Sequence, residues 1–175
     1  MPGQYAQMTR PEFEHEMATT RKLLERIPED KLDWKMDDRS HTLAWNGSHI
    51  AEIPGWAANI LTEAFFDMNP GGNNAYSTEV FKGVAPLLAR FDEHVAQATA
   101  ALNTIRDENV AETWQFKDNG QVLLEMPRFA AFRTWVISHT IHHRAILSVY
   151  FRQLGVKVPS IYGPSGDDAG SYGAA

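Results

Sequence analysis

Residues 80–102 read VFKGVAPLLARFDEHVAQATAAL, and this stretch decides the class of fold that the sequence predicts. Its apolar side chains recur every three or four residues, from Phe81 through Leu88 to Leu102, so they share one face of a helix. Ser77 precedes the run and could cap its first turn. We therefore predict a long amphipathic helix between Ser77 and Leu102 whose apolar face packs in the core.

Three further stretches show the same helical periodicity of apolar residues. They cover residues 10–26, 43–65 and 127–155. Ser40 or Thr42 can cap the second of these helices, and Pro54 inside it predicts a kink because proline removes one backbone hydrogen bond. Pro127 opens the last helix and Gly155 ends it, which are the usual positions of these residue types at helix ends.

The region before the last helix has a different pattern. Trp114 and Phe116 alternate around a polar residue, and Asn119-Gly120 is a typical hairpin turn, so a short hairpin or an extended crossover is expected. Four helices with one long crossover predict an all-α fold, a four-helix bundle. We expect one domain over residues 1–175, whose end, from about residue 160, is a turn-rich and partly mobile tail.

The composition argues against several classes of protein. The 175 residues carry a net charge of -6 and their basic residues are scattered, so we expect no nucleic-acid partner. No apolar run approaches the roughly 20 residues that span a bilayer, which predicts a cytoplasmic protein without membrane contact. The chain has no cysteine, so any metal site must use histidine and carboxylate ligands.

A pair of histidines in the last helix is the first candidate for chemistry. His139 and His143 are four residues apart, so both imidazoles project from one helix face at a spacing that suits one divalent ion. Thr140 stands where zinc proteases of this pattern carry glutamate, which disfavours a metallopeptidase. Such pairs also occur as surface or core histidines, but this pair shares the apolar stripe of Trp135, where unpaired imidazoles would be costly.

A third ligand is needed for a reactive site of the usual kind, in which three protein ligands leave one position open. His49 lies on the apolar stripe of the second helix and is the best candidate, because metal sites in bundles are built from facing helices. Glu52 follows one turn later and could orient a ligand, act as a catalytic base, or form only a surface salt bridge. Arg144 could hold an anionic substrate or form an ion pair.

Three motifs together resemble one known family. They lie in residues 43–56, 139–150 and 158–165, and they are similar to those of the DinB-like (damage-inducible) metalloenzyme superfamily. The resemblance implies an up-down-down-up bundle, often a homodimer, with His49, His139 and His143 as ligands of zinc, nickel or another divalent ion such as iron or manganese. It also implies relatives among transferases and isomerases that use mycothiol, bacillithiol or glutathione.

Two functions from different classes follow. In the first, the protein is a metal-dependent enzyme that activates water or a low-molecular-weight thiol for attack on a small-molecule substrate, as a thiol transferase or a hydrolase. In the second, it is a non-catalytic, stress-associated binding protein whose metal ion only fastens two helices together. A third hypothesis, that the chain binds no metal at all, is the least favoured because the three motifs occur together.

Overall fold

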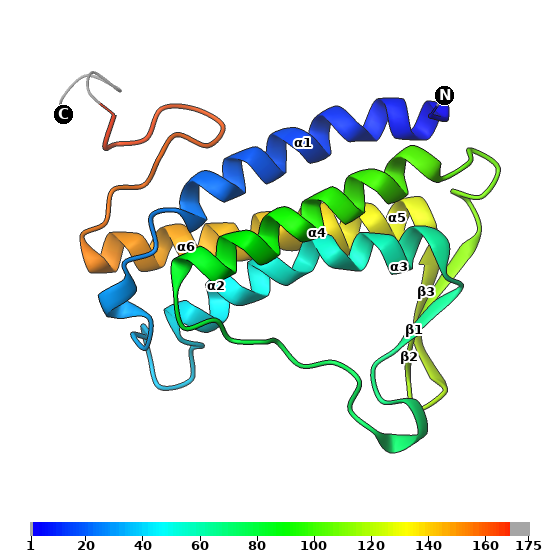
Figure 1. The fold of residues 1–175 in the computed structure, drawn as a ribbon, viewed down its shortest axis with the longest axis horizontal. Helices are drawn as coiled ribbons and strands as arrows, with labels where there is room; N and C mark the ends of the chain where they lie inside the picture. Colours follow the sequence, from blue (N-terminus) through cyan, green and yellow to red (C-terminus); the bar gives the residue numbers. More distant parts are fainter. Residues whose placement is uncertain (1, 169–175) are drawn as a thin grey trace.

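The structure is a computed structural model that describes residues 2–168, and within these residues the helices form four rods (Figure 1). The rods are α1 (Gln4–Leu24); α2 (Leu43–Glu52) with the 3-10 turn η2 (Ile53–Gly55) and α3 (Trp56–Thr62); α4 (Val84–Thr104); and α5 (Arg128–Phe132) with η4 (Arg133–Ser138) and α6 (His139–Leu154). Short 3-10 turns, η1 (Glu29–Lys31) and η3 (Pro70–Gly72), lie in the connections. The first and fourth rods run in one direction and the other two run in the opposite direction (Figure 1).

A three-stranded mixed sheet at one end of the helices shows that the predicted all-α class is wrong (Figure 1). Its strands, in the order β1-β2-β3, are β1 (Phe65–Asp67), β2 (Thr113–Asp118) and β3 (Gln121–Pro127). The hairpin of β2 and β3 turns at Asn119 and Gly120, which both have positive φ, as the sequence pattern indicated. The parallel pairing of β1 with β2 was not predicted, because the prediction extended the second helix to Phe65.

Two helix starts differ from the predictions because contacts from distant parts of the chain determine them. Helix α1 begins at Gln4 rather than near residue 10, and the Asp107 carboxylate accepts hydrogen bonds from the backbone N–H groups of Gln4 and Tyr5 at 2.7 and 2.8 Å. Helix α4 begins at Val84 rather than at Ser77. The backbone before it is extended, and the backbone N–H of Phe81 there donates to a side chain of α2.

Local signals placed one helix cap, the kink and the last helix end correctly. Thr42 caps α2, since its hydroxyl accepts a hydrogen bond from the backbone N–H of Trp45 at 3.1 Å. Pro54 lies in the 3-10 turn η2 between α2 and α3, where a kink was predicted. Gly155 ends α6 in the left-handed conformation, with φ 69°.

The C-terminal segment is fastened to the bundle by a buried ion pair. Arg144 on α6 lies 2.7 Å from the Glu16 carboxylate on α1, and both side chains are buried. The Tyr162 hydroxyl accepts from Arg144 at 2.7 Å and donates to Glu16 at 2.9 Å. This tail was predicted to be turn-rich, and residues 169–175 of it lie outside the described part of the chain.

The structure also bears on membrane contact. Among the helices of residues 2–168, none combines the length and the apolar character that a bilayer crossing requires.

Replacing Glu16 by alanine should lower the free energy of unfolding by about 3–5 kcal/mol, because Arg144 would remain buried without its charge partner. Urea unfolding followed by far-UV circular dichroism measures this change. The matched control is Glu14→Ala on the same helix. The Glu14 side chain is half-exposed and pairs with Arg10 at the surface, so its loss should lower the free energy of unfolding by less than about 0.5 kcal/mol. Equal losses in the two variants would contradict the importance of the buried pair.

Candidate metal site

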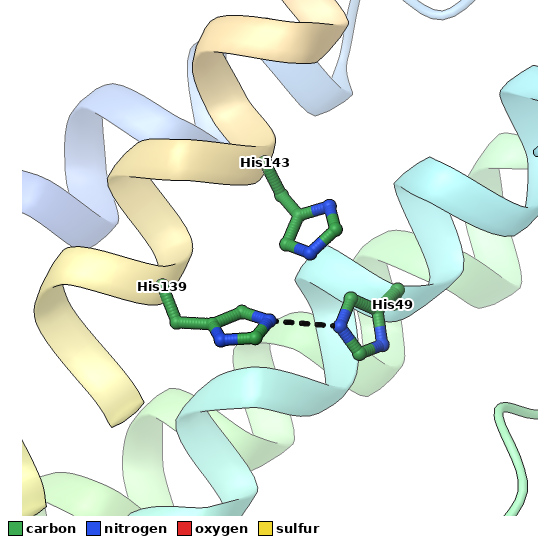
Figure 2. A group of neighbouring side chains, drawn as sticks. All are labelled: His49, His139 and His143. Atoms are coloured by element: carbon green, nitrogen blue, oxygen red, sulfur yellow. Dashed lines mark hydrogen bonds between the residues drawn. The ribbon is translucent and has the colours of Figure 1, made fainter. Parts of the chain in front are cut away.

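Three histidine side chains from two rods point toward one another (Figure 2). His49 lies in the last turn of α2, and His139 and His143 lie on α6, which packs beside it. One nitrogen from each ring can be chosen so that all three lie within 4.8 Å of one another. The Nε2 atoms of His49 and His139 are 3.1 Å apart. The structure therefore brings together the three residues that the sequence analysis selected.

The rings fit the donor set of a divalent ion. Two nitrogens bound tetrahedrally at about 2.0–2.1 Å from zinc would lie about 3.3 Å apart, close to the observed 3.1 Å between His49 and His139. His143 donates from Nδ1 to the Asn46 side-chain oxygen at 2.9 Å, which leaves its Nε2 as a lone-pair donor. His49 is held in the same way, by a contact of 3.3 Å between its Nδ1 and the Thr78 hydroxyl.

The surroundings keep these rings uncharged. Burial, and after it the neighbouring ring of His139, lower the pKa of His49 to about 4. Burial also lowers the pKa of His143 to about 3, and that of His139 falls for the same reason. All three imidazoles are therefore neutral near pH 7, and the neutral imidazole is the form that binds a metal ion.

Aromatic side chains surround the three histidines. The Trp45 ring stacks on the His49 ring, with centroids 4.7 Å apart and planes 16° from parallel. Trp56 presents an edge contact to both His49 and His139, at 5.5 and 5.3 Å. Trp135 lies 5.8 Å from His139. The structure therefore places three tryptophans as walls of the candidate site.

Glu52, the predicted catalytic residue, anchors the long connection that follows β1. One carboxylate oxygen accepts the backbone N–H of Glu79 at 2.8 Å, and the other accepts the Tyr76 hydroxyl at 3.1 Å. Burial raises the pKa of Tyr76 above its ordinary value, and the Glu52 charge adds to this, so the hydroxyl stays protonated and donates. The same connection carries Thr78 to His49.

The sequence analysis missed Asn46 and Thr78. Asn46 lies one turn before His49 on the predicted helix, so its position was a usable signal for a residue that orients a ligand. Thr78 lay in a stretch that was predicted to be helical, and only the extended path of residues 77–82 brings it to the site. Arg144 is held by Glu16 in the buried ion pair, which leaves it no role at this site.

Comparison with known proteins identifies the family. A sequence model described as the DinB family matches residues 5–170. The chain belongs to the DinB family. The resemblance inferred from the three motifs is thereby confirmed, and the match spans nearly the whole of the chain.

Two Bacillus subtilis proteins are similar to this chain along most of their length. A curated Bacillus subtilis (strain 168) protein named "Uncharacterized protein YrdA" is 25% identical over 165 residues, which cover 92% of this chain and 90% of that protein. A crystal structure of a DinB-like protein from Bacillus subtilis, YjoA, superposes with a TM-score of 0.67 at 21% identity, covering 93% of this chain and 100% of that one.

A second crystal structure, of a DinB-like protein from Bacillus cereus ATCC 10987, gives a TM-score of 0.61 at 21% identity, with 85% of this chain and 91% of that chain covered. At these identities the two superpositions support the fold of the DinB family and carry no statement about function.

The metal-free protein should lose stability as the pH falls from about 6.5 towards 4. The folded state holds the pKa of His49 near 4, below the 6.5 of an ordinary histidine, so in this window the unfolded state binds more protons and is favoured. This contribution to stability is complete above pH 6.5. Urea unfolding of chelator-treated protein at about pH 7, 6 and 5 measures it. A His49→Gln variant should show a flatter dependence, and an unchanged slope in that variant would exclude His49 as a cause.

Proposed function

We propose that this DinB family protein binds one divalent metal ion through His49, His139 and His143, with zinc or nickel as the first candidates and iron or manganese as others. The observation that carries the proposal is the meeting of three neutral imidazoles from two rods within 4.8 Å. Carboxylates and sulfur play no part in this donor set, and borderline metals such as zinc and nickel accept imidazole readily.

We propose further that the site is catalytic, as in a metal-dependent transferase or hydrolase. When bound, the ion would supply Lewis acidity at an open fourth position and so lower the pKa of a water molecule or a small thiol there. Because the chain has no cysteine, any thiolate must come from a cosubstrate such as mycothiol, bacillithiol or glutathione. Assembly as a homodimer and a role under stress belong to this proposal by analogy with the family.

The side chains of this protein would orient the reactants and limit access of water. Asn46 and Thr78 fix the ring orientations of His143 and His49. Trp45 and Trp56 shield the imidazoles from solvent. Glu52 contributes as a positioning residue, because both of its carboxylate oxygens hold the connection that carries Tyr76 and Thr78.

A non-catalytic protein with a structural metal ion is the second candidate function. One observation favours it: the ligands come from α2 and α6, so a bound ion would fasten these two rods together (Figure 2). The two functions differ in what the fold loses without the ion. A structural site makes a large part of the folding free energy depend on the metal, whereas a catalytic site leaves a folded metal-free bundle.

Mass-spectrometric metal analysis of untagged protein should find about one divalent ion per chain. The variant with His49, His139 and His143 all replaced by alanine should contain almost none. The matched control is His142→Ala, which removes an exposed histidine next to the ligands and should leave the metal content unchanged. Wild-type protein that holds no metal even after reconstitution would overturn the proposal.

The same variants decide between the two candidate functions. A triple variant that keeps its helical circular dichroism and its cooperative unfolding supports a catalytic site, and a variant that unfolds supports a structural one.

Replacing Asn46 by alanine should weaken metal binding by about 10–100-fold, because His143 loses the partner that fixes its ring and its tautomer. Competition with a chromophoric chelator measures the affinity. Asn59→Ala serves as the control for loss of a half-buried asparagine on the same rod, since its side chain contacts Trp114 and not a histidine. Equal metal affinities of wild type and Asn46→Ala would show that Asn46 does not orient the ligand.

A further inference from the structure

A cavity of about 350 Å³ adjoins the three histidines at the end of the bundle that carries the sheet. Its volume lies within the range of small-molecule sites, roughly 300–1,000 Å³. The side chains that line it come from α3, β1, β2, η4 and the connection after β1. They are chiefly aromatic, namely Trp56, Phe66, Tyr76, Trp114, Phe116 and Trp135.

Two of the lining residues also touch the candidate metal ligands. Trp56 makes edge contacts with the rings of both His49 and His139, at 5.5 and 5.3 Å between centroids. Trp135 approaches His139 at 5.8 Å from the other rod. The cavity and the metal site therefore share a wall, and a molecule in the cavity would lie against side chains that contact the histidines on their other side.

The aromatic rings of the cavity are arranged for a flat occupant. Phe66 and Phe116 are nearly parallel, with an interplanar angle of 11°. Phe116 is also within 26° of the plane of Trp114 and within 28° of the plane of Trp135. Ring faces with a common orientation favour a planar guest, which can stack on them in offset geometry.

The cavity offers nothing that would balance a charge. Within residues 2–168, none of its lining side chains belongs to Asp, Glu, Lys, Arg or His. Its amide side chain, Asn59, is already engaged, because its oxygen accepts the Trp114 indole N–H at 3.0 Å and its nitrogen donates to the Phe65 carbonyl at 3.2 Å. Transfer of an ion into such surroundings is strongly unfavourable.

One polar atom of a lining residue has no hydrogen-bond partner among the described residues. The indole Nε1 of Trp135 is buried and has no hydrogen-bond partner within the described residues, 2–168. A buried donor without an acceptor costs about 1–3 kcal/mol, and a small shift of the Trp135 ring on binding would let an oxygen of the bound molecule accept from it. Trp135 also lies in η4, a π-helical turn that leads directly into His139, and π-helical turns are frequent at functional sites.

We propose that this cavity binds the planar, uncharged and largely apolar part of a substrate, about one or two fused rings in size and bearing a hydrogen-bond acceptor. As a statement about substrate class, this rests on the proposed metal-dependent function, since the histidines would act on the end of the molecule that faces them. Binding itself needs no metal ion, because the lining residues are not the candidate ligands.

The test uses chelator-treated protein and 2-acetylnaphthalene, an aromatic ketone, as the probe. Equilibrium dialysis should show saturable binding, and tryptophan fluorescence should be quenched, because three of the five tryptophans line the cavity. The anion 2-naphthoate should bind at least about tenfold more weakly. Absence of saturable binding of the ketone, or equal binding of the anion, would overturn the proposal.

Variants of the β2–β3 hairpin locate the bound probe. Phe116→Glu places a carboxylate in the cavity wall and should weaken ketone binding by at least about tenfold. The control, Leu123→Glu, makes the same kind of change at an exposed position on β3 outside the cavity and should alter the affinity by less than about twofold. Equal affinities of a folded Phe116→Glu variant and wild type would place the probe elsewhere.

The outcomes separate this inference from the proposed function. If the ketone binds but wild-type protein takes up no metal even after reconstitution, the cavity is kept and the metal-dependent reaction is rejected. If the protein takes up metal but never binds the ketone, only the substrate class is rejected.

Discussion

The packing of α2 against α6 is the interaction on which the candidate site depends. It places His49 opposite His139 and His143 and removes all three rings from much of the solvent, which lowers each pKa and keeps the imidazoles neutral. Neutral nitrogens at 3.1 Å need a shared proton or a shared cation, because two lone pairs repel each other at that distance. A divalent ion satisfies this need for all three rings at once, which a single proton cannot do.

The connection between β1 and α4 gives the site a second set of partners. It crosses from the sheet to the opposite end of the bundle, and it is extended where a helix was predicted (Figure 1). Along this path Thr78 contacts His49, and Tyr76 forms part of the cavity wall. Glu52 bonds to both ends of this short stretch, at Tyr76 and Glu79. The Glu52 carboxylate therefore holds the segment that contributes Thr78 to the metal site and Tyr76 to the cavity.

A buried charged network on another face of α6 holds this helix against α1 and the C-terminal segment. Arg144 follows His143 directly, yet its guanidinium pairs with Glu16 on α1 and donates to Tyr162 of the C-terminal segment. Successive residues on a helix are about 100° apart around its axis, so neighbours in sequence face different partners. The helix that carries two candidate ligands is thus joined to α1 by a buried ion pair.

The sequence by itself determined the features that depend on neighbours along the chain. The periodicity of residues 80–102 identified α4, although not its start. Thr42, Pro54 and Gly155 marked helix ends and the kink, and the i, i+4 spacing placed His139 and His143 on one face. Each of these signals acts within one or two turns of backbone, where spacing and propensity decide the outcome. His49 could be chosen as the third candidate because apolar stripes of facing helices must meet in the core.

Only the tertiary structure decided the features that depend on distant contacts. The start of α1 is determined by Asp107, and the extended path before α4 by Ser48 and Glu52. Strand β1 is three residues long and exists through its pairing with β2, some fifty positions later, so its own sequence could not distinguish it from the end of a helix. The all-α prediction failed for this reason, since a short strand gains its hydrogen bonds from a partner that local sequence does not reveal.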